Sequence, residues 1–157
     1  MSASREPVLA VVGLGANLGE ATRAVRSALE ALGALPETTL ESASRLYRTA
    51  PHQAQGPDYI NAVACLRTRL TAPALFDQLL RLEQAAGRER PWHHAPRTLD
   101  LDLLFYGDGR IESPRLVVPH PRWDQRAFVL VPLAEVWPDR VSAHQIEAVR
   151  HQPITPA

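Results

Sequence analysis

The sequence contains little cysteine and has no excess of either charge. Cys65 is its only cysteine, which excludes an internal disulfide framework and a zinc site built from several cysteines. Such cysteine usage is typical of a cytoplasmic protein, so we expect that location. Lysine and arginine together number 17, as do aspartate and glutamate, and the formal net charge is zero. No overall field then favours nucleic acid or an anionic membrane surface, and we expect neither as a partner.

Long apolar runs and low-complexity tracts are also missing. No apolar run approaches the roughly 20 residues of a membrane span, and the N-terminal residues lack the order of a signal peptide. Hydrophobic residues make up 45% and charged residues 22% of the 157-residue chain, as in ordinary globular proteins. We therefore expect one domain over residues 1–157, with a core at about 8–140. The tail at 141–157 has little periodicity from Ala143 onward, so we expect it to be loosely ordered.

Apolar periodicity predicts an α+β fold. Strands are expected at 8–12, 39–47, 59–68 and 99–106, and helices at 21–32 and from about Pro73 to Gly87. The order βαββαβ, with further pieces at the C-terminal end, is typical of a ferredoxin-like sandwich. We expect an antiparallel sheet with helices on one face and an active-site cleft on the other.

Gly13 to Gly19 holds three glycines and invites comparison with phosphate-binding loops. The third glycine is misplaced for the dinucleotide fingerprint, and the lysine and hydroxyl residue of a Walker A loop are absent. We expect instead a tight turn from the first strand into the first helix.

The strongest chemical signal is the pair Asp100 and Asp102 within an apolar strand. Residues two apart point to the same strand face, so the two carboxylates are expected side by side. Like charges this close repel one another and need cations nearby. Carboxylate oxygens with water and phosphate oxygens favour Mg²⁺, and two such ions can clamp a polyphosphate. The competing interpretation is an exposed strand face with ordinary solvated aspartates.

Three arginines, Arg88, Arg90 and Arg97, lie in the polar loop before that strand. Guanidinium groups pair with phosphate oxygens in a bidentate way and keep their charge at working pH. A loop carrying Arg88 and Arg90 could close on a triphosphate and exclude water. A solvated loop held by salt bridges is the alternative.

Three further side chains are candidates for ligand binding. His120 lies between two prolines and could donate to a phosphate oxygen, and a structural turn is the alternative. Asn61 could read the donor and acceptor edge of a heterocycle while Tyr59 helps to seal the pocket. A buried amide satisfied by the backbone explains Asn61 equally well.

Five blocks of sequence stand in a recognisable order, at 13–19, 47–51, 57–62, 83–102 and 118–130. The fourth is the most specific, because Gly87-Arg88-Glu89-Arg90 precedes Pro96-Arg97-Thr98-Leu99-Asp100-Leu101-Asp102 at a fixed distance. Together the blocks resemble the 6-hydroxymethyl-7,8-dihydropterin pyrophosphokinases over about residues 8–140. In one place the pattern differs, since the family usually has Arg-Trp-Gly-Pro where this chain has His93-His94-Ala95-Pro96. We expect that change to affect loop closure and rate more than the reaction.

The resemblance implies a single catalytic domain that moves the β,γ-pyrophosphoryl unit of ATP to the hydroxymethyl oxygen of the pterin and releases AMP. It implies two Mg²⁺ ions held by Asp100 and Asp102, small-molecule substrates only, and a monomer, with Glu83 at the site margin. The residues implied in catalysis are Arg88, Arg90, Arg97, Asp100 and Asp102. Those implied in ATP binding are Arg88, Arg97, Leu103, His120 and Arg126. Those implied in pterin binding are Thr49, Ala50, Pro51, Tyr59, Asn61 and Phe128.

Two other functions remain open when the residues are considered without the resemblance. A nucleotidyltransferase that moves AMP and releases pyrophosphate would also use paired aspartates and arginines. An RNA-binding ferredoxin-like module would need exposed aromatics and a basic surface, which an acidic strand and zero net charge disfavour.

Overall fold

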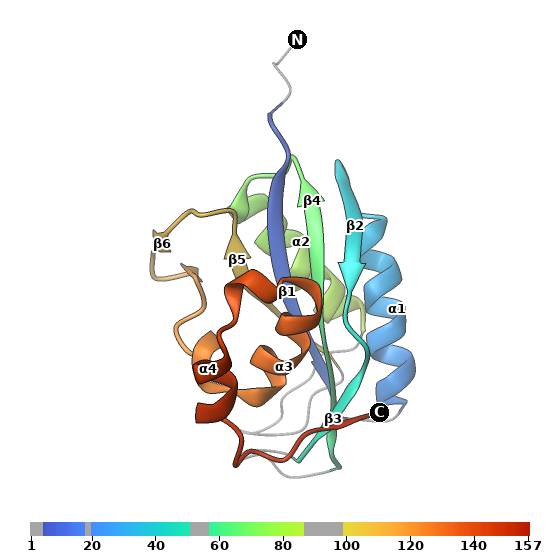
Figure 1. The fold of residues 1–157 in the computed structure, drawn as a ribbon. Coiled ribbons are helices and arrows are strands. Elements are labelled where there is room, and N and C mark those ends of the chain that lie inside the picture. The colour runs from blue at the N-terminus through green and yellow to red at the C-terminus, as the bar shows by residue number, and fades with distance from the viewer. Residues whose placement is uncertain (1–4, 18–19, 51–56, 87–98) are drawn as a thin grey trace.

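One antiparallel sheet organises the chain (Figure 1). The structure is a computed structural model and describes residues 5–17, 20–50, 57–86 and 99–157. The strands are β1 (Val8–Ala16), β2 (Thr38–Ala43), β3 (Tyr47–Thr49), β4 (Tyr59–Thr68), β5 (Asp100–Tyr106), β6 (Ile111–Glu112), β7 (Val117–Val118) and β8 (Thr155–Pro156). The helices are α1 (Ala21–Gly33), α2 (Ala72–Ala85), α3 (Ala127–Val136) and α4 (Ala143–Ala148), with short 3-10 turns η1 (Trp123–Gln125) and η2 (Pro138–Arg140). Within these ranges no helix is long and apolar enough to cross a lipid bilayer.

The strand order confirms the ferredoxin-like prediction. The main sheet runs β5-β1-β4-β3-β8, and β2 also pairs with β4. Since β1 and β2 are both antiparallel to β4, they are parallel to each other, and α1 connects them. In the same way β4 and β5 flank β1, and α2 connects them. These are two interlocked split βαβ units. The single strand expected at 39–47 is in fact two short strands, β2 and β3.

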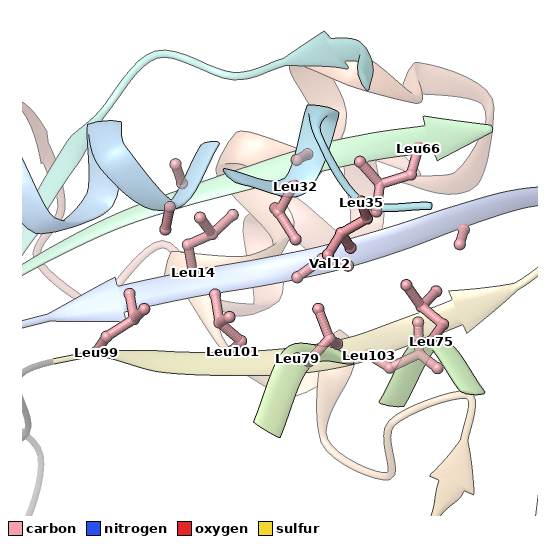
Figure 2. Packing of buried hydrophobic residues seen from close by; sticks show 14 of the residues in the cluster. Val12, Leu14, Leu32, Leu35, Leu66, Leu75, Leu79, Leu99, Leu101 and Leu103 are labelled. Atoms are coloured by element: carbon pink, nitrogen blue, oxygen red, sulfur yellow. The ribbon is translucent and has the colours of Figure 1, made fainter. Parts of the chain in front are cut away.

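The main core lies between the sheet and the two helices α1 and α2, as predicted. Alternate residues of β4, beginning with Ile60 and Ala62, face these helices because strand side chains alternate between faces. Leu32 of α1 and Leu79 of α2 are fully or almost fully buried against the sheet (Figure 2). Helix α2 begins at a Thr71 cap, whose side-chain oxygen accepts a hydrogen bond from the backbone N–H of Ala74 at 3.2 Å.

Strand β1 is longer than the sequence predicts. The tight turn expected from Gly13 onward is wrong, because the strand continues to Ala16 and pairs with β4 and β5 over its whole second half. Leu14 and Ala16 still fill the main core, so Gly13 and Gly15 fall on the opposite face. The glycines therefore leave that part of the sheet without side chains instead of reversing the chain.

The second face of the sheet is partly covered, where the prediction left it free for loops and ligand. Helix α3 packs there, with Val129 and Leu133 against Val11 and Val63 of the sheet. In Figure 1, α3 and α4 lie on the side of the sheet opposite to α2. The sequence from Ala127 to Val136 is apolar except for Glu135, which suits a helix that is covered on most of its surface.

A β-bulge divides β5 into two halves. Val11 pairs with Phe105 and Val12 pairs with Leu103, so Leu104 is an extra residue in this strand. As a result Leu104 and Phe105 both pack on the α3 side. The Phe105 ring makes edge contacts with Trp123 and Trp137, at centroid distances of 4.9 and 5.6 Å.

The C-terminal segment is ordered, and the prediction of a loosely ordered tail is wrong. Helix α4 begins with a capping box in which Ser142 and Gln145 each bond the other's backbone. Strand β8 then pairs with β3, and the backbone N–H of Ala157 donates to the carbonyl of Leu46 at 2.9 Å. The segment is held because it completes the edge of the sheet and packs Val149 against α3.

Candidate active site

A cavity of about 620 Å³ lies on the second face of the sheet, beside the N-terminal end of α3. Its walls come from β1, β4, β5, the start of α3 and the C-terminal segment. The lining residues are Gly13, Leu14, Gly15, Thr49, Ala50, Tyr59, Asn61, Ala62, Asp100, Asp102, Leu104, Arg122, Gln125, Arg126, Ala127, Phe128, Val129, His151, Gln152 and Pro153. The volume falls in the usual range for small-molecule sites.

The acidic pair lies in one wall of this cavity. Asp100 and Asp102 are both half-buried, and both line the cavity from β5. Their neighbours across the strand pair are Gly15 and Gly13, which have no side chains. The space beside the carboxylates is therefore open to a ligand, and this is the juxtaposition that the D-x-D spacing predicts.

Glu83 holds the backbone between the two aspartates. Its carboxylate is buried, with 3% of the residue exposed, and its Oε2 accepts a hydrogen bond from the backbone N–H of Leu101 at 2.7 Å. In the described sheet β5 is an edge strand, so α2 supplies through Glu83 an acceptor that no neighbouring strand provides. Glu83 thus lies behind the acidic pair, on the margin that the resemblance implies.

Arg126 lines the same cavity and interacts electrostatically with the acidic pair. Burial and the charge of Arg122 lower the pKa of Arg126, while the negative charges of Asp102 and Asp100 raise it. The guanidinium stays charged at neutral pH, because an arginine side chain is protonated at all working pH values. Its carbon lies 5.3 Å from the ring centre of Phe128, so cation and aromatic face are stacked.

His120 lies next to this charged group, although it does not line the cavity itself. Its backbone N–H donates to the carbonyl of Leu104 at 3.0 Å, which ties the His120 turn to β5. Burial and then the charge of Arg126 lower the pKa of His120, and the charge of Asp100 opposes them. Its Nδ1 accepts from the backbone N–H of Arg122 at 3.2 Å. The neutral ring therefore carries its proton on Nε2 and can donate from there.

A polar group and two aromatic rings also contribute to the cavity lining. Asn61 is buried, with 5% exposed, and its Nδ2 donates to Oγ1 of Thr49 at 2.7 Å. This bond fixes the orientation of the amide. Tyr59 and Phe128 line the same cavity from β4 and α3. A methyl group on Gly15 would lie 3.1 Å from the Asn61 Oδ1, so the glycine leaves room for the amide.

The structure does not place every predicted residue at the site. Arg88, Arg90, Arg97 and Pro51 lie outside the described residues. Leu103 is described, but its side chain is 3% exposed and packs in the main core, toward α2 (Figure 2). It faces away from the cavity because it alternates with Asp102 along β5.

Several cavity residues were missed at the level of sequence. Arg122 and Gln125 come from the turn before α3, and residues 151–153 come from the C-terminal segment. Nothing in their local sequence marks them, since they reach the cavity only through packing of distant segments. Gly13 and Gly15 could have been found, because glycines at alternate positions of a strand mark a close approach of ligand or backbone.

Oxygen donors at the site fit a hard divalent cation. In the part of the chain that the structure describes, no cluster of three or more His, Cys, Asp or Glu could hold a metal. Asp100 and Asp102 therefore offer a partial ligand set, which water and phosphate oxygens would complete. Mg²⁺ is commonly bound in this way, by one or two carboxylates together with substrate phosphates.

Comparisons with known proteins match the chain to one family. The family described as 7,8-dihydro-6-hydroxymethylpterin-pyrophosphokinase (HPPK) matches residues 11–138. A relative from Synechocystis sp., named 2-amino-4-hydroxy-6-hydroxymethyldihydropteridine pyrophosphokinase, is 46% identical over 132 residues, which cover 84% of this chain and 68% of the relative. A protein of the same name from Pseudomonas aeruginosa is 45% identical over 129 residues, covering 82% of this chain and 80% of the relative.

Solved structures agree on the fold. A crystal structure of an HPPK-DHPS in complex with substrates superposes with a TM-score of 0.65 and 13% sequence identity. The superposition covers 92% of this chain and 42% of that chain, so this chain spans about two fifths of the solved protein. The length and closeness of the family match decide the assignment: the chain belongs to the 7,8-dihydro-6-hydroxymethylpterin-pyrophosphokinase family.

Proposed function

We propose that the chain transfers pyrophosphate from ATP to 6-hydroxymethyl-7,8-dihydropterin, giving AMP and the pterin diphosphate for folate biosynthesis. Family membership supports this reaction, since the relatives are named as pyrophosphokinases for this pterin. The structural observation that carries the proposal is one cavity with an acidic pair on one wall and an oriented amide on another. The first suits metal-bound phosphates, and the second suits the edge of a heterocycle.

Asp100 and Asp102 would hold Mg²⁺ through their carboxylate oxygens, and two ions are part of the proposal. When bound, the metal neutralises phosphate charge and stabilises the charge that develops during transfer. The carboxylates face the cavity from one strand whose backbone is fixed by Glu83 at 2.7 Å. This wall is therefore rigid, as positioning of a polyphosphate requires.

Cationic and donor groups would bind the phosphates around this wall. Arg126 faces the acidic pair, and neutral His120 would donate from Nε2 to a phosphate oxygen. We propose the same role for Arg88, Arg90 and Arg97 on the basis of the sequence. Proximity, charge neutralisation and exclusion of water would supply most of the rate, without a covalent intermediate or a dedicated general base.

The amide of Asn61 would recognise the pterin. Because its Nδ2 is already engaged by Thr49, its Oδ1 is the atom left to accept from the heterocycle. Tyr59 and Phe128, which line the cavity, would cover the ring, with the backbone of Thr49 and Ala50 beside it. We propose the same role for Pro51 on the basis of the sequence. Leu103 has no part in this proposal, because it packs in the core.

The wider setting is part of the proposal. Residues 1–157 would act as one catalytic domain, with small-molecule substrates and as a monomer. We propose a cytoplasmic location, which the buried, unpaired thiol of Cys65 supports.

Product identification with two charge-removing variants tests the function. The wild type, given ATP, Mg²⁺ and the reduced pterin, should form AMP and a pterin diphosphate. Asp100→Asn and Asp102→Asn should each lower kcat by at least about 100-fold, on the scale of removing a main source of transition-state charge stabilisation. Both variants should remain folded, because each relieves repulsion between two carboxylates.

A matched control distinguishes loss of a carboxylate at the site from loss of a carboxylate elsewhere on the protein. Asp108→Asn removes an exposed carboxylate just beyond the end of β5 and should leave kcat unchanged. Free pyrophosphate as the product would point to nucleotidyl transfer and refute the proposal. Full Mg²⁺-dependent activity in either Asp100→Asn or Asp102→Asn would refute the metal assignment.

A further inference from the structure

The side chain of Gln152 joins the C-terminal segment to the start of α3 by two hydrogen bonds. Its Oε1 accepts from the backbone N–H of Ala127 at 2.8 Å, and its Nε2 donates to the carbonyl of Gln125 at 3.0 Å. The residue between these two anchor points is Arg126. We infer that Gln152 is a positioning residue that aims Arg126 at the nucleotide phosphates, an inference that rests on the proposed function.

The carbonyl of Arg126 accepts from the backbone N–H groups of Val129 and Leu130 at 3.1 and 2.9 Å, but its side chain forms no cap. Arg126 is the N-cap of α3, with an extended backbone (φ −129°, ψ 124°) and no side-chain cap bond. The N–H of Ala127 is one of the first N–H groups of a helix, which have no partner inside the helix. The turn η1 ends at Gln125, so Arg126 is the single extended residue between two helical segments. The side-chain amide of Gln152 binds the backbone of both Gln125 and Ala127, and this restricts the backbone angles of Arg126 between them.

The direction of Arg126 matters because of what it faces. Its guanidinium interacts with Asp102 and Asp100 across the cavity and stacks over Phe128 at 5.3 Å. A small rotation of the extended backbone would carry the long side chain away from the acidic pair. Positioned charges in phosphoryl transfer lose much of their effect when misplaced by about 1 Å.

Gln152 is itself held firmly on both sides. Its backbone N–H donates to the carbonyl of Val149 at 2.9 Å, and Val149 is buried with Ala127 and Leu130. Shortly beyond it, β8 pairs with β3, where the end of the chain lies beside the sheet (Figure 1). Gln152 is therefore a rigid support, and it also lines the cavity directly. The family match covers residues 11–138, and Gln152 lies beyond it.

A pair of variants in the same segment tests the inference. Gln152→Met keeps the length of the side chain and removes both hydrogen bonds. Gln145→Ala removes one side chain of the α4 capping box, far from the cavity lining, and serves as the matched control for loss of a structural hydrogen bond. For each variant we would measure kcat, the KM of the pterin, and the Kd of α,β-methylene-ATP with Mg²⁺, an analogue whose reacting bridge cannot be cleaved.

Gln152→Met should weaken α,β-methylene-ATP binding and lower kcat, each by about 5- to 20-fold, which is the scale of one to two lost hydrogen bonds. The pterin KM should change by less than about twofold. The control should change all three by less than about twofold. In an Arg126→Ala background, Gln152→Met should have almost no further effect, since coupled residues are not additive.

Equal effects of Gln152→Met in both backgrounds, or equal effects of Gln152→Met and Gln145→Ala, would overturn the inference. Failure of the proposed function is a separate result. A wild type that forms no AMP and pterin diphosphate would refute the function, whereas the nucleotide Kd values would still decide whether Gln152 acts through Arg126.

Discussion

Gly15→Ala should weaken pterin binding while leaving nucleotide binding intact. The added methyl group would lie 3.1 Å from Oδ1 of Asn61 and 3.8 Å from Cδ1 of Tyr59. The first contact is tighter than carbon and oxygen ordinarily make, so the amide must move by a few tenths of an ångström. Asn61 cannot move freely, because Thr49 holds its Nδ2 at 2.7 Å.

The size of the effect follows from the hydrogen bond at stake. A misplaced or unmade hydrogen bond in a buried site costs about 1–3 kcal/mol. At 1.4 kcal/mol for each factor of ten, the pterin Kd should rise by about 5- to 150-fold. Asn61→Ala should give a loss of similar size, and the double variant should add little, because both substitutions remove the same contact.

The assay is a calorimetric titration with a pterin analogue, in the presence of Mg²⁺ and α,β-methylene-ATP, followed by a titration of the nucleotide alone. Gly13→Ala is the matched control, since the nearest neighbours of its methyl group would be side-chain carbons of Leu104 at 3.4–3.7 Å, which are ordinary apolar contacts. Unchanged pterin affinity in Gly15→Ala, or an equal loss in Gly13→Ala, would refute the argument. Equal loss of nucleotide affinity would show general disruption of the cavity.

Two further predictions concern stability. Glu83→Ala should lower the free energy of unfolding, measured in urea, by about 1–3 kcal/mol, because it leaves the backbone N–H of Leu101 without its acceptor. Glu83→Gln keeps an acceptor and should lose less stability. Equal losses of stability in the two variants would contradict this explanation. For His120, burial and Arg126 lower the folded-state pKa, so the unfolded chain binds the proton more readily. Protonation of His120 therefore favours the unfolded chain, so the free energy of unfolding is highest above the unfolded-state pKa of about 6.5 and falls as the pH is lowered. In urea unfolding with EDTA, the free energy of unfolding should fall more between pH 7.5 and pH 5.5 for the wild type than for His120→Asn. Equal decreases in the two proteins would contradict this role of His120.

Local periodicity was enough to predict the core and the faces of the central strands. In β4, the alternation that puts Ile60 on the helix side and Asn61 on the cavity side is a property of any extended strand. The same rule placed Asp100 and Asp102 together. It also directs the side chain of Leu103 into the core, away from the cavity.

Features that depend on distant segments were not predictable in this way. The end of β1 was misplaced because Gly13 and Gly15 are typical of turns, and only pairing with β4 and β5 keeps them extended. The C-terminal segment has weak periodicity, although Ser142 and Gln145 form a capping-box pattern that is visible in the sequence. That Gln152 reaches the start of α3 follows from packing alone, because 24 intervening positions separate it from Ala127.

The extra residue Leu104 explains how β5 can present both the acidic pair and Phe105 on one face of the sheet. Asp100 and Asp102 occupy even positions and Phe105 an odd one, yet all three are directed toward the α3 side. In a strictly alternating strand, seating Phe105 between Trp123 and Trp137 would turn both carboxylates into the apolar interior. The bulge at Leu104 shifts the alternation by one position, so deleting Leu104 would place Phe105 directly after Leu103 and keep the aromatic packing and the acidic wall on one face without a bulge.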